Sequence, residues 1–168
     1  EVITSGTPAA PVALAHAGLR AGRFVHRVSP GTVVYNDMSS LDLLPGYGYT
    51  AAVVVMATVI SHPAPHIFTC DAGHKSISAD AGTPTCRVVG YPDLKPLKPS
   101  EEHLPIDVGT WGQAPPIGSL IYLSPRHVCP TVNNFDEAVI VVAGGIRSVE
   151  RVAARGHECR IMEPLVPK

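Results

Sequence analysis

Apolar positions come in short runs along this 168-residue chain, separated by turn-forming residues. Seventeen prolines and fifteen glycines interrupt the pattern, and only residues 9–19 show helical character. Thr7 is placed to cap this helix, and Pro8 suits its first position. Val-rich or alternating runs that predict strands occupy residues 24–28, 32–35, 52–60, 67–70, 119–123, 139–143 and 146–152. Many short strands separated by turns predict a mainly β fold, either a barrel or a sandwich.

Two features of the pattern sharpen this prediction. Gly144 and Gly145 fall between the last two predicted strands, where a two-residue hairpin turn is expected. The longest apolar run, residues 51–60, has about half the length that a membrane-spanning helix needs, and its valines favour a buried strand. We therefore expect neither a membrane-spanning segment nor a membrane partner.

Composition excludes several classes of protein. The chain is 45% hydrophobic and 16% charged, so it can bury a core and should be ordered. Its net charge of −1 gives no electrostatic attraction to nucleic acid, and 5% aromatic residues leave few side chains for base stacking. We expect no nucleic-acid partner.

The four cysteines are Cys70, Cys86, Cys129 and Cys159. No Cys-x-x-Cys pair is present, and we interpret them as reduced thiols of a cytoplasmic protein. An even count also permits two disulfides, so a secreted, disulfide-stapled β domain without a metal is an alternative.

His127 and Cys129 form the segment with the most chemical potential. In an extended chain, residues i and i+2 point to one side, and Pro130 favours extended geometry for the residue before it. An imidazole and a thiolate together favour zinc, and two protein ligands leave positions open for water or substrate, as in catalytic sites. The alternative is that both side chains serve packing alone.

Two further segments carry titratable groups. Ser100-Glu101-Glu102-His103 offers two carboxylates and an imidazole for proton transfer or metal binding, or simply a helix start capped by Ser100. Lys75 follows a predicted strand, and we interpret it as a solvated turn lysine rather than a cofactor lysine.

Taken in order, several motifs resemble one known family. The chain is similar, nearly up to Gly156, to the C-terminal portion of the D-threonine aldolase / D-serine dehydratase family. The motifs are Ser5-Gly6-Thr7-Pro8, Ser29-Pro30-Gly31-Thr32, Tyr35-Asn36-Asp37, Asp71-Ala72-Gly73-His74-Lys75, Ser100-Glu101-Glu102-His103 and Pro125-Arg126-His127-Val128-Cys129-Pro130. Leu104 departs from the pattern, which usually has glycine after Glu-Glu-His.

The resemblance implies a fold and a domain organisation. Members are fold-type III pyridoxal-phosphate (PLP) enzymes, similar to alanine racemase, with a (β/α)8 barrel that holds PLP on a lysine. The fold class we expect is mainly β: a β-barrel-like C-terminal domain preceded by the last strand and helix of a (β/α)8 barrel. Residues 1–22 would be the barrel remnant, residues 23–157 a metal-bearing β domain, and residues 158–168 a tail.

The resemblance also implies site residues and cofactors. His127 and Cys129 match the metal ligands, with zinc the expected ion and manganese an alternative. Ser5, Gly6 and Thr7 would cradle the PLP phosphate, and His103 is a candidate catalytic residue. A cysteine as the second ligand favours the dehydratase branch.

The implied function is that of a lyase acting on D-3-hydroxy amino acids such as D-serine or D-threonine. The reaction would be dehydration to a 2-oxo acid and ammonia, or retro-aldol cleavage to glycine and an aldehyde. This chain alone should be inactive, because the PLP lysine is not among its residues, and the full-length protein would be a homodimer. The alternative is a non-catalytic metal-binding β-barrel module.

Overall fold

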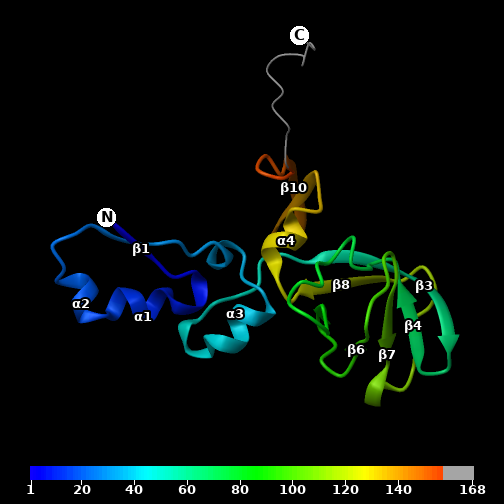
Figure 1. Cartoon of the computed structure of the whole chain (residues 1–168). Coiled ribbons are helices and arrows are strands. Elements are labelled where there is room, and N and C mark those ends of the chain that lie inside the picture. The colour runs from blue at the N-terminus through cyan, green and yellow to red at the C-terminus, as the bar shows by residue number, and fades with distance from the viewer. Residues whose placement is uncertain (157–168) are drawn as a thin grey trace, which may run out of the picture.

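Six antiparallel strands form the main sheet of the protein and nearly close it into a barrel (Figure 1). The structure is a computed structural model that describes residues 1–156. The strands are β3 (Val55–Ala64), β4 (Ile67–Cys70), β5 (Cys86–Val88), β6 (Lys95–Pro96), β7 (Leu104–Asp107) and β8 (Leu120–Pro125). Their order across the sheet is β5-β8-β3-β4-β7-β6, and the edge strands β5 and β6 contact each other. The predicted mainly β, barrel-like class is confirmed.

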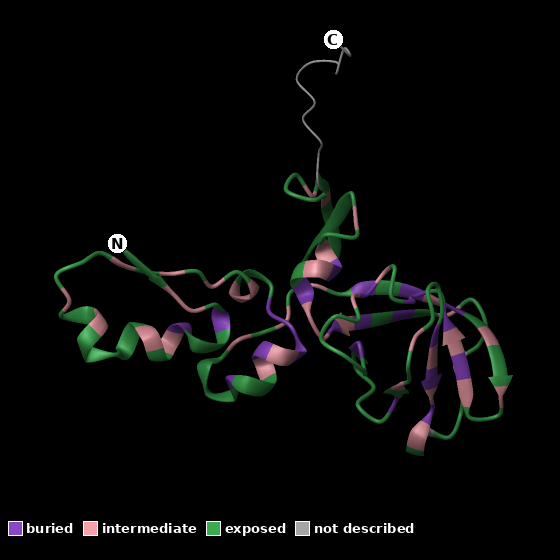
Figure 2. Ribbon diagram, in the orientation of Figure 1, coloured by how far each residue is buried: buried purple, intermediate pink, exposed green. Residues whose placement is uncertain are grey.

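The core of the protein lies inside this sheet, as the buried segments in Figure 2 show. Along β3, Val55, Ala57 and Val59 are buried, whereas Met56 between them is 61% exposed. This alternation places every second side chain on the inner face, as the pleat of a strand requires. Phe68 of β4 is fully buried beside them. The strand expected at residues 52–60 therefore begins three residues later and is buried on one face only.

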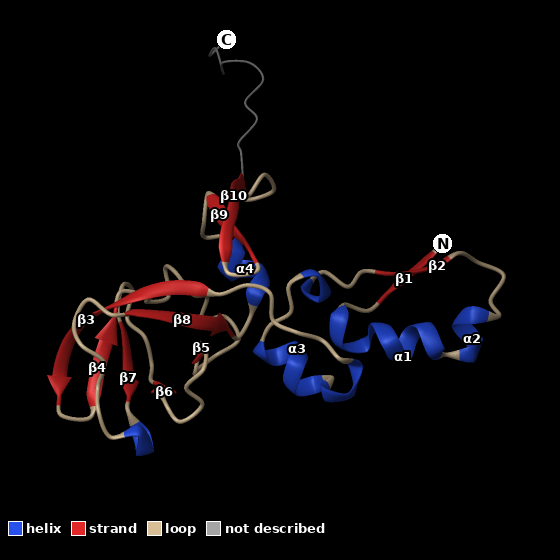
Figure 3. Cartoon of the chain, turned by 180° about the vertical axis from the view of Figure 1, so that it is seen from behind, coloured by secondary structure: helices blue, strands red, loops and turns tan. Residues whose placement is uncertain are grey.

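The N-terminal part of the chain extends away from the barrel as a separate arm (Figures 1 and 3). Its elements are β1 (Val2–Thr4), α1 (Ala10–Ala15), α2 (Ala17–Arg20), β2 (His26–Val28) and α3 (Met38–Leu43), with 3-10 helices at Thr7–Ala9, Thr32–Val34 and Pro45–Tyr47. Strands β1 and β2 pair in parallel and are joined through the helices. Such a helical crossover is the connection found in α/β barrels.

Three local predictions for this arm were wrong. Thr7 does not cap the first helix, because its hydroxyl accepts a hydrogen bond from the backbone N–H of Val33 instead. His16, in extended geometry, divides the expected helix into α1 and α2. The strand predicted at residues 32–35 is a 3-10 helix, although its valines favour a strand, because the turn after Gly31 continues with local hydrogen bonds.

A two-stranded hairpin follows the short helix α4 (Val128–Val132) and points away from the barrel (Figure 1). Its strands are β9 (Glu137–Val142) and β10 (Gly145–Arg151). Ala143 and Gly144, both with positive φ, form the turn, one residue earlier than predicted. Gly145 already pairs with Val142. No helix in residues 1–156 is long and apolar enough to cross a membrane.

Candidate metal-binding site

The predicted metal segment lies where β8 ends and α4 begins. His127 has extended backbone geometry and precedes the first helical residue, Val128. The prediction that Cys129 is extended was wrong, because Cys129 and Pro130 both lie inside α4. Pro130 is tolerated there because it occupies the first turn, where a backbone N–H has no helical acceptor to lose.

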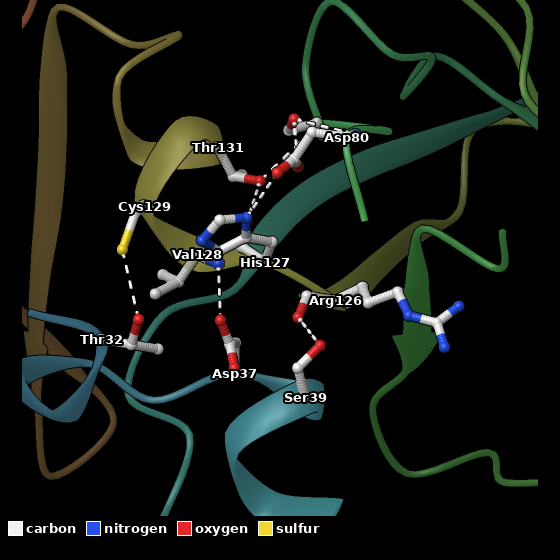
Figure 4. Close-up of polar contacts among 10 residues, drawn as sticks. Thr32, Asp37, Ser39, Asp80, Arg126, His127, Val128, Cys129 and Thr131 are labelled. Carbon is white, nitrogen blue, oxygen red and sulfur yellow. Dashed lines mark hydrogen bonds and ion pairs between the residues drawn. The ribbon is translucent and has the colours of Figure 1, made fainter. Parts of the chain in front are cut away.

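Because the helix begins between them, the two side chains take different directions (Figure 4). The His127 ring reaches Asp80, with 2.6 Å between Nδ1 and Oδ2. The Cys129 thiol is exposed and lies 3.4 Å from the hydroxyl of Thr32. Within residues 1–156, no hydrogen bond engages the His127 Nε2 atom, and in Figure 4 that edge of the ring faces the side where Cys129 lies.

Asp37 holds the backbone of the His127–Cys129 segment through a hydrogen bond. Its carboxylate is 1% exposed, and its two oxygens serve two helices. One oxygen accepts the N–H of Ser40 at 2.9 Å and caps α3, and the other accepts the N–H of Val128 at 3.0 Å, at the start of α4. A carboxylate at two helix starts satisfies otherwise unpaired donors and favours both dipoles.

A second contact joins helix α3 to the residues just before α4. The carbonyl of Arg126 accepts hydrogen bonds from both the backbone N–H and the hydroxyl of Ser39, at 3.3 Å and 3.0 Å. The arm thus holds the chain on both sides of His127. The candidate site is consequently built from the barrel and from the N-terminal arm together (Figure 4).

Asp80 is partly withdrawn from solvent, which opposes its ionisation. Hydrogen bonds from the Ser78 hydroxyl and from His127, together with the backbone N–H of Ala81, outweigh that effect. The pKa of Asp80 therefore lies below its ordinary value. An ionised carboxylate is thus present beside the imidazole at neutral pH.

The donors at this site suit a metal that accepts nitrogen and sulfur. In the described part of the chain, no group of three or more His, Cys, Asp or Glu side chains gathers to hold a metal. Among residues 1–156, the site therefore has two candidate donors, the exposed Cys129 thiol and the His127 ring nitrogen. Such a pair fits zinc with positions left for water or substrate.

The other titratable segment forms a clasp between two loops. The side chain of Lys75 pairs with the carboxylates of Glu101 and Glu102, at 2.6 Å and 2.9 Å. The hydrogen bonds that Lys75 donates to these carboxylates, and then their charges, raise the pKa of Lys75, so the amine stays protonated. The interpretation of Lys75 as a solvated turn lysine agrees with this arrangement. A Cβ at Gly73 would overlap the backbone at Glu101, so the loops approach more closely than any other residue allows.

His103 lies at the end of this clasp. The expected helix start at Ser100 is wrong: the Ser100 hydroxyl accepts the N–H of His103 at 3.2 Å in a turn, and β7 follows. Leu104, at the position where glycine is usual, is fully buried in the core. His103 lines an open cavity of about 490 Å³ together with Ser61, Thr69 and Lys98. Within residues 1–156, no hydrogen bond or ion pair joins it to His127 or Cys129.

The Ser5-Gly6-Thr7 turn lies in the arm between β1 and α1, and the Thr7 hydroxyl accepts the N–H of Val33, the neighbour of Thr32. Ser5 has a positive φ of 49°, and a Cβ at Gly6 would meet no atom within 4 Å. The backbone N–H groups of Gly6 and Thr7 donate to no other described residue. Gly6 is exposed whereas Thr7 is only 2% exposed, so the open space that a phosphate would need lies at Gly6.

Two of the cysteines belong to the core and not to the site. Cys70 and Cys86 are fully buried and unpaired, and Cys129 is likewise a free thiol. Burial, reinforced by the charge of Asp71, raises the pKa of Cys70 to about 12, and burial raises the pKa of Cys86 to about 12. Cys159 lies outside the described residues. The described thiols thus agree with the reduced interpretation, and none forms a disulfide with another described cysteine.

Sequence reasoning assigned no role in the site to Thr32, Asp37 or Asp80, although Thr32 and Asp37 stand in the motifs that carry the resemblance. Asp37 carried a usable signal, because an Asp three residues before Ser40 is typical of a helix N-cap. Asp80 carried none, because its partner His127 lies 47 residues away.

Known proteins resemble this chain over both the barrel and the arm. The family model described as "Putative serine dehydratase domain" matches residues 52–141. Among curated relatives, a D-threonine aldolase of Arthrobacter sp. is 38% identical over 105 residues, which make up 62% of this chain and 27% of that protein. A 3-hydroxy-D-aspartate aldolase of Paracoccus denitrificans is 35% identical over 62% of this chain and 26% of its own length. This chain thus spans about a quarter of their length.

A third relative is matched over most of its own length. An uncharacterized protein of Mycobacterium tuberculosis is 29% identical over 117 residues, covering 62% of this chain and 84% of that protein. The shared domain therefore makes up most of that shorter relative.

Solved structures show the same fold. The D-threonine aldolase of Filomicrobium marinum matches with a TM-score of 0.74 and 27% identity, over 92% of this chain and 41% of its own. The D-threo-3-hydroxyaspartate dehydratase of Delftia sp. HT23 matches with a TM-score of 0.68 and 25% identity, over 93% and 44%. That dehydratase has also been solved with alanine in place of a histidine and, separately, of a cysteine two positions later, the latter in a metal-free form.

Proposed function

Because the chain belongs to the serine dehydratase domain family, we propose that it is the metal-bearing part of a PLP-dependent lyase. The substrates would be D-3-hydroxy amino acids, as the names of the related aldolases and the dehydratase suggest. The observation that carries the proposal is the pair of donors at the start of α4, His127 and Cys129, inside the matched region.

We propose His127 and Cys129 as the metal ligands, with zinc as the ion and manganese as the alternative. Their spacing equals that of the histidine and the cysteine replaced in the dehydratase variants, one of which is metal-free. The free Nε2 atom and the exposed thiol are the donors, and the hydroxyl of Thr32 beside the sulfur can hydrogen-bond a thiolate. Cysteine as the second ligand favours dehydration over aldol cleavage.

The cofactors would supply the chemistry, and the chain would supply positions for them. When bound, the metal polarises the substrate's 3-hydroxyl as a Lewis acid, while PLP withdraws electrons from the substrate. Ser5, Gly6 and Thr7 would receive the PLP phosphate on free backbone N–H groups. His103, which lines the open cavity of about 490 Å³, would be a candidate for proton transfer.

Turnover would belong to a longer protein, since the related aldolases are far longer than the part this chain matches. We propose that this longer protein is homodimeric and cytoplasmic. Residues 1–22 would belong to the PLP-binding barrel, residues 23–157 to the metal-bearing domain, and residues 158–168 to a tail. The parallel pairing of β1 with β2 supports a barrel-type unit in the arm, but β2 extends that unit to Val28, past the boundary expected at residue 22.

A second function is favoured by the mycobacterial relative, in which this domain makes up most of the protein. In that case the chain would be a metal-binding β-barrel module without catalysis. Zinc binding without measurable affinity for PLP, in this chain and in that relative, would support the module.

Elemental analysis tests the metal site common to both functions. We expect about one zinc or manganese ion per chain in the wild type, and loss of the metal in both His127→Ala and Cys129→Ala. His66→Ala is the matched control, because it removes an exposed imidazole elsewhere and should keep the metal. Equal metal content in all four proteins would contradict the assignment of His127 and Cys129.

A further inference from the structure

The Asp80 carboxylate contacts His127 from a loop that the barrel holds in place. Asp80 follows Ile77, which is fully buried in the core. The carboxylate Oδ2 lies 2.6 Å from the His127 Nδ1, although 47 residues separate the two. The contact between Asp80 and His127 therefore depends on the fold that brings the two segments together.

A network of hydrogen bonds links Asp80 to His127 a second time, through Ser78 and Thr131. The second oxygen of Asp80 accepts the Ser78 hydroxyl at 2.7 Å, and the Ser78 N–H donates to the Thr131 hydroxyl at 3.2 Å. The Thr131 hydroxyl in turn donates to the carbonyl of His127 at 2.8 Å, and this threonine is 1% exposed. Both partners of the Asp80–His127 pair are thus linked through a buried hydroxyl, unlike a surface ion pair between two free side chains.

The contact with the Asp80 carboxylate decides which nitrogen of the His127 imidazole carries the proton. A carboxylate accepts only, so Nδ1 must donate and carry the hydrogen. In the neutral ring, Nε2 then keeps its lone pair free for a metal or another electron acceptor. Within residues 1–156, no other hydrogen bond to the imidazole holds the proton on Nδ1.

We propose that Asp80 is a positioning residue that fixes His127 in its Nδ1–H tautomer and so leaves the Nε2 lone pair available to a metal. Ser78 and Thr131 hold Asp80 and His127 in register. The inference rests on the proposed function for the identity of the ligand, whereas the tautomer is a property of the metal-free chain.

Two measurements on three variants test the proposal. Asp80→Ala removes the acceptor, and Asp80→Asn keeps an acceptor oxygen without the charge. Asp42→Ala is the matched control, because Asp42 is a similarly exposed carboxylate that pairs with Arg87 and not with His127. Far-ultraviolet circular dichroism checks that each variant folds.

Long-range ¹H–¹⁵N correlation of metal-free protein at about pH 8, above the ordinary histidine pKa, reports the tautomer directly. We expect a protonated Nδ1 and a bare Nε2 for His127 in the wild type and in Asp42→Ala. In Asp80→Ala the proton should move mainly to Nε2. Wild-type His127 with its proton on Nε2, or an unchanged tautomer in Asp80→Ala, would overturn the proposal.

Zinc affinity, measured by competition with a chromophoric chelator, gives the second readout. We expect a loss of about 10- to 100-fold in Asp80→Ala, a smaller loss in Asp80→Asn, and no loss in Asp42→Ala. Equal affinity in wild type and Asp80→Ala would overturn the positioning role. A wild type that carries the Nδ1–H tautomer but binds no zinc would overturn the proposed function while upholding the orientation of His127 by Asp80.

Discussion

The barrel and the β9–β10 hairpin are both built from Val- and Ile-rich strands, yet they treat those side chains in opposite ways. In the barrel, Val59, Phe68, Leu104 and Leu123 are fully buried. In the hairpin, the large aliphatic side chains remain between 38% and 75% exposed. The same local pattern therefore produces a core only where a second set of strands closes over it, because a two-stranded ribbon has nothing to bury its faces against.

The candidate metal site lies at the boundary between these regions. Helix α4 connects the barrel to the hairpin, and the arm contacts its start through Asp37 and Thr32 (Figures 1 and 4). The barrel core holds the loop that carries Asp80, whereas the candidate donors His127 and Cys129 lie where β8 ends and α4 begins. Stability and binding should therefore respond to different residues.

The largest contrast should come from truncating a side chain in each region. Phe68→Ala in the barrel should lower the free energy of unfolding by about 3–5 kcal/mol, because it leaves a cavity in a closed core. Ile146→Ala in the hairpin, where the side chain is 75% exposed, should change it by less than about 0.5 kcal/mol. Urea denaturation followed by circular dichroism measures both. Equal losses would show that the hairpin belongs to the same cooperative core.

Thiol reactivity should separate the barrel from the site by a smaller factor. Cys70 and Cys86 are buried with pKa values raised to about 12, whereas Cys129 is exposed. In a Cys159→Ser background, Cys129 should be alkylated at least about a hundredfold faster at pH 8, because the thiolate is the reactive form. Peptide mapping after timed iodoacetamide treatment gives the rates. Similar rates at Cys86 and Cys129 would contradict the closed barrel.

Asp37 should matter more than its exposed neighbour Asp42 on the same helix. Asp37→Ala leaves the N–H groups of Ser40 and Val128 without their acceptor and should cost about 1–3 kcal/mol of stability. Asp42→Ala removes only a surface ion pair with Arg87 and should cost less than about 1 kcal/mol. Thermal unfolding of the two variants side by side tests this, and equal melting temperatures would remove Asp37 as the link between arm and site.

The clasp at Lys75 should give the smallest effect. The hydrogen bond that Lys75 donates to Glu101, and then the charge of Lys75, lower the pKa of Glu101 in the folded protein. A depressed carboxyl pKa stabilises the fold above the unfolded-state value, and that contribution disappears as the pH falls through the folded value. Glu101→Gln should therefore slightly reduce stability at pH 7 and have no effect at pH 2–3, with the difference screened by high salt. A larger effect at acidic pH would reverse the assigned sign.

Much of the fold could be predicted because strands and turns leave local patterns. Strand β4 falls at the predicted residues, and the hairpin turn lies within one residue of its predicted place. The segment at residues 32–35 misled the prediction, since β-branched residues also fit a single 3-10 turn. Local hydrogen bonding there outweighs intrinsic preference.

The site could be predicted only in part, for a related reason. His127 and Cys129 stand close together in sequence, so their chemistry is visible, but the helix start between them is not. Asp80 reaches His127 across 47 residues, and Asp37 reaches Val128 across 91. Such contacts depend on how the barrel closes, which no local pattern specifies.

Cobalt(II) titration of the purified chain tests the metal site most directly, because the visible spectrum reports the ligands themselves. We predict a thiolate-to-cobalt charge-transfer band that saturates at about one ion per chain, disappears in Cys129→Ala and weakens strongly in His127→Ala. A spectrum identical to that of free cobalt(II), or a thiolate band that survives Cys129→Ala, would contradict the assignment of this pair as the metal-binding centre.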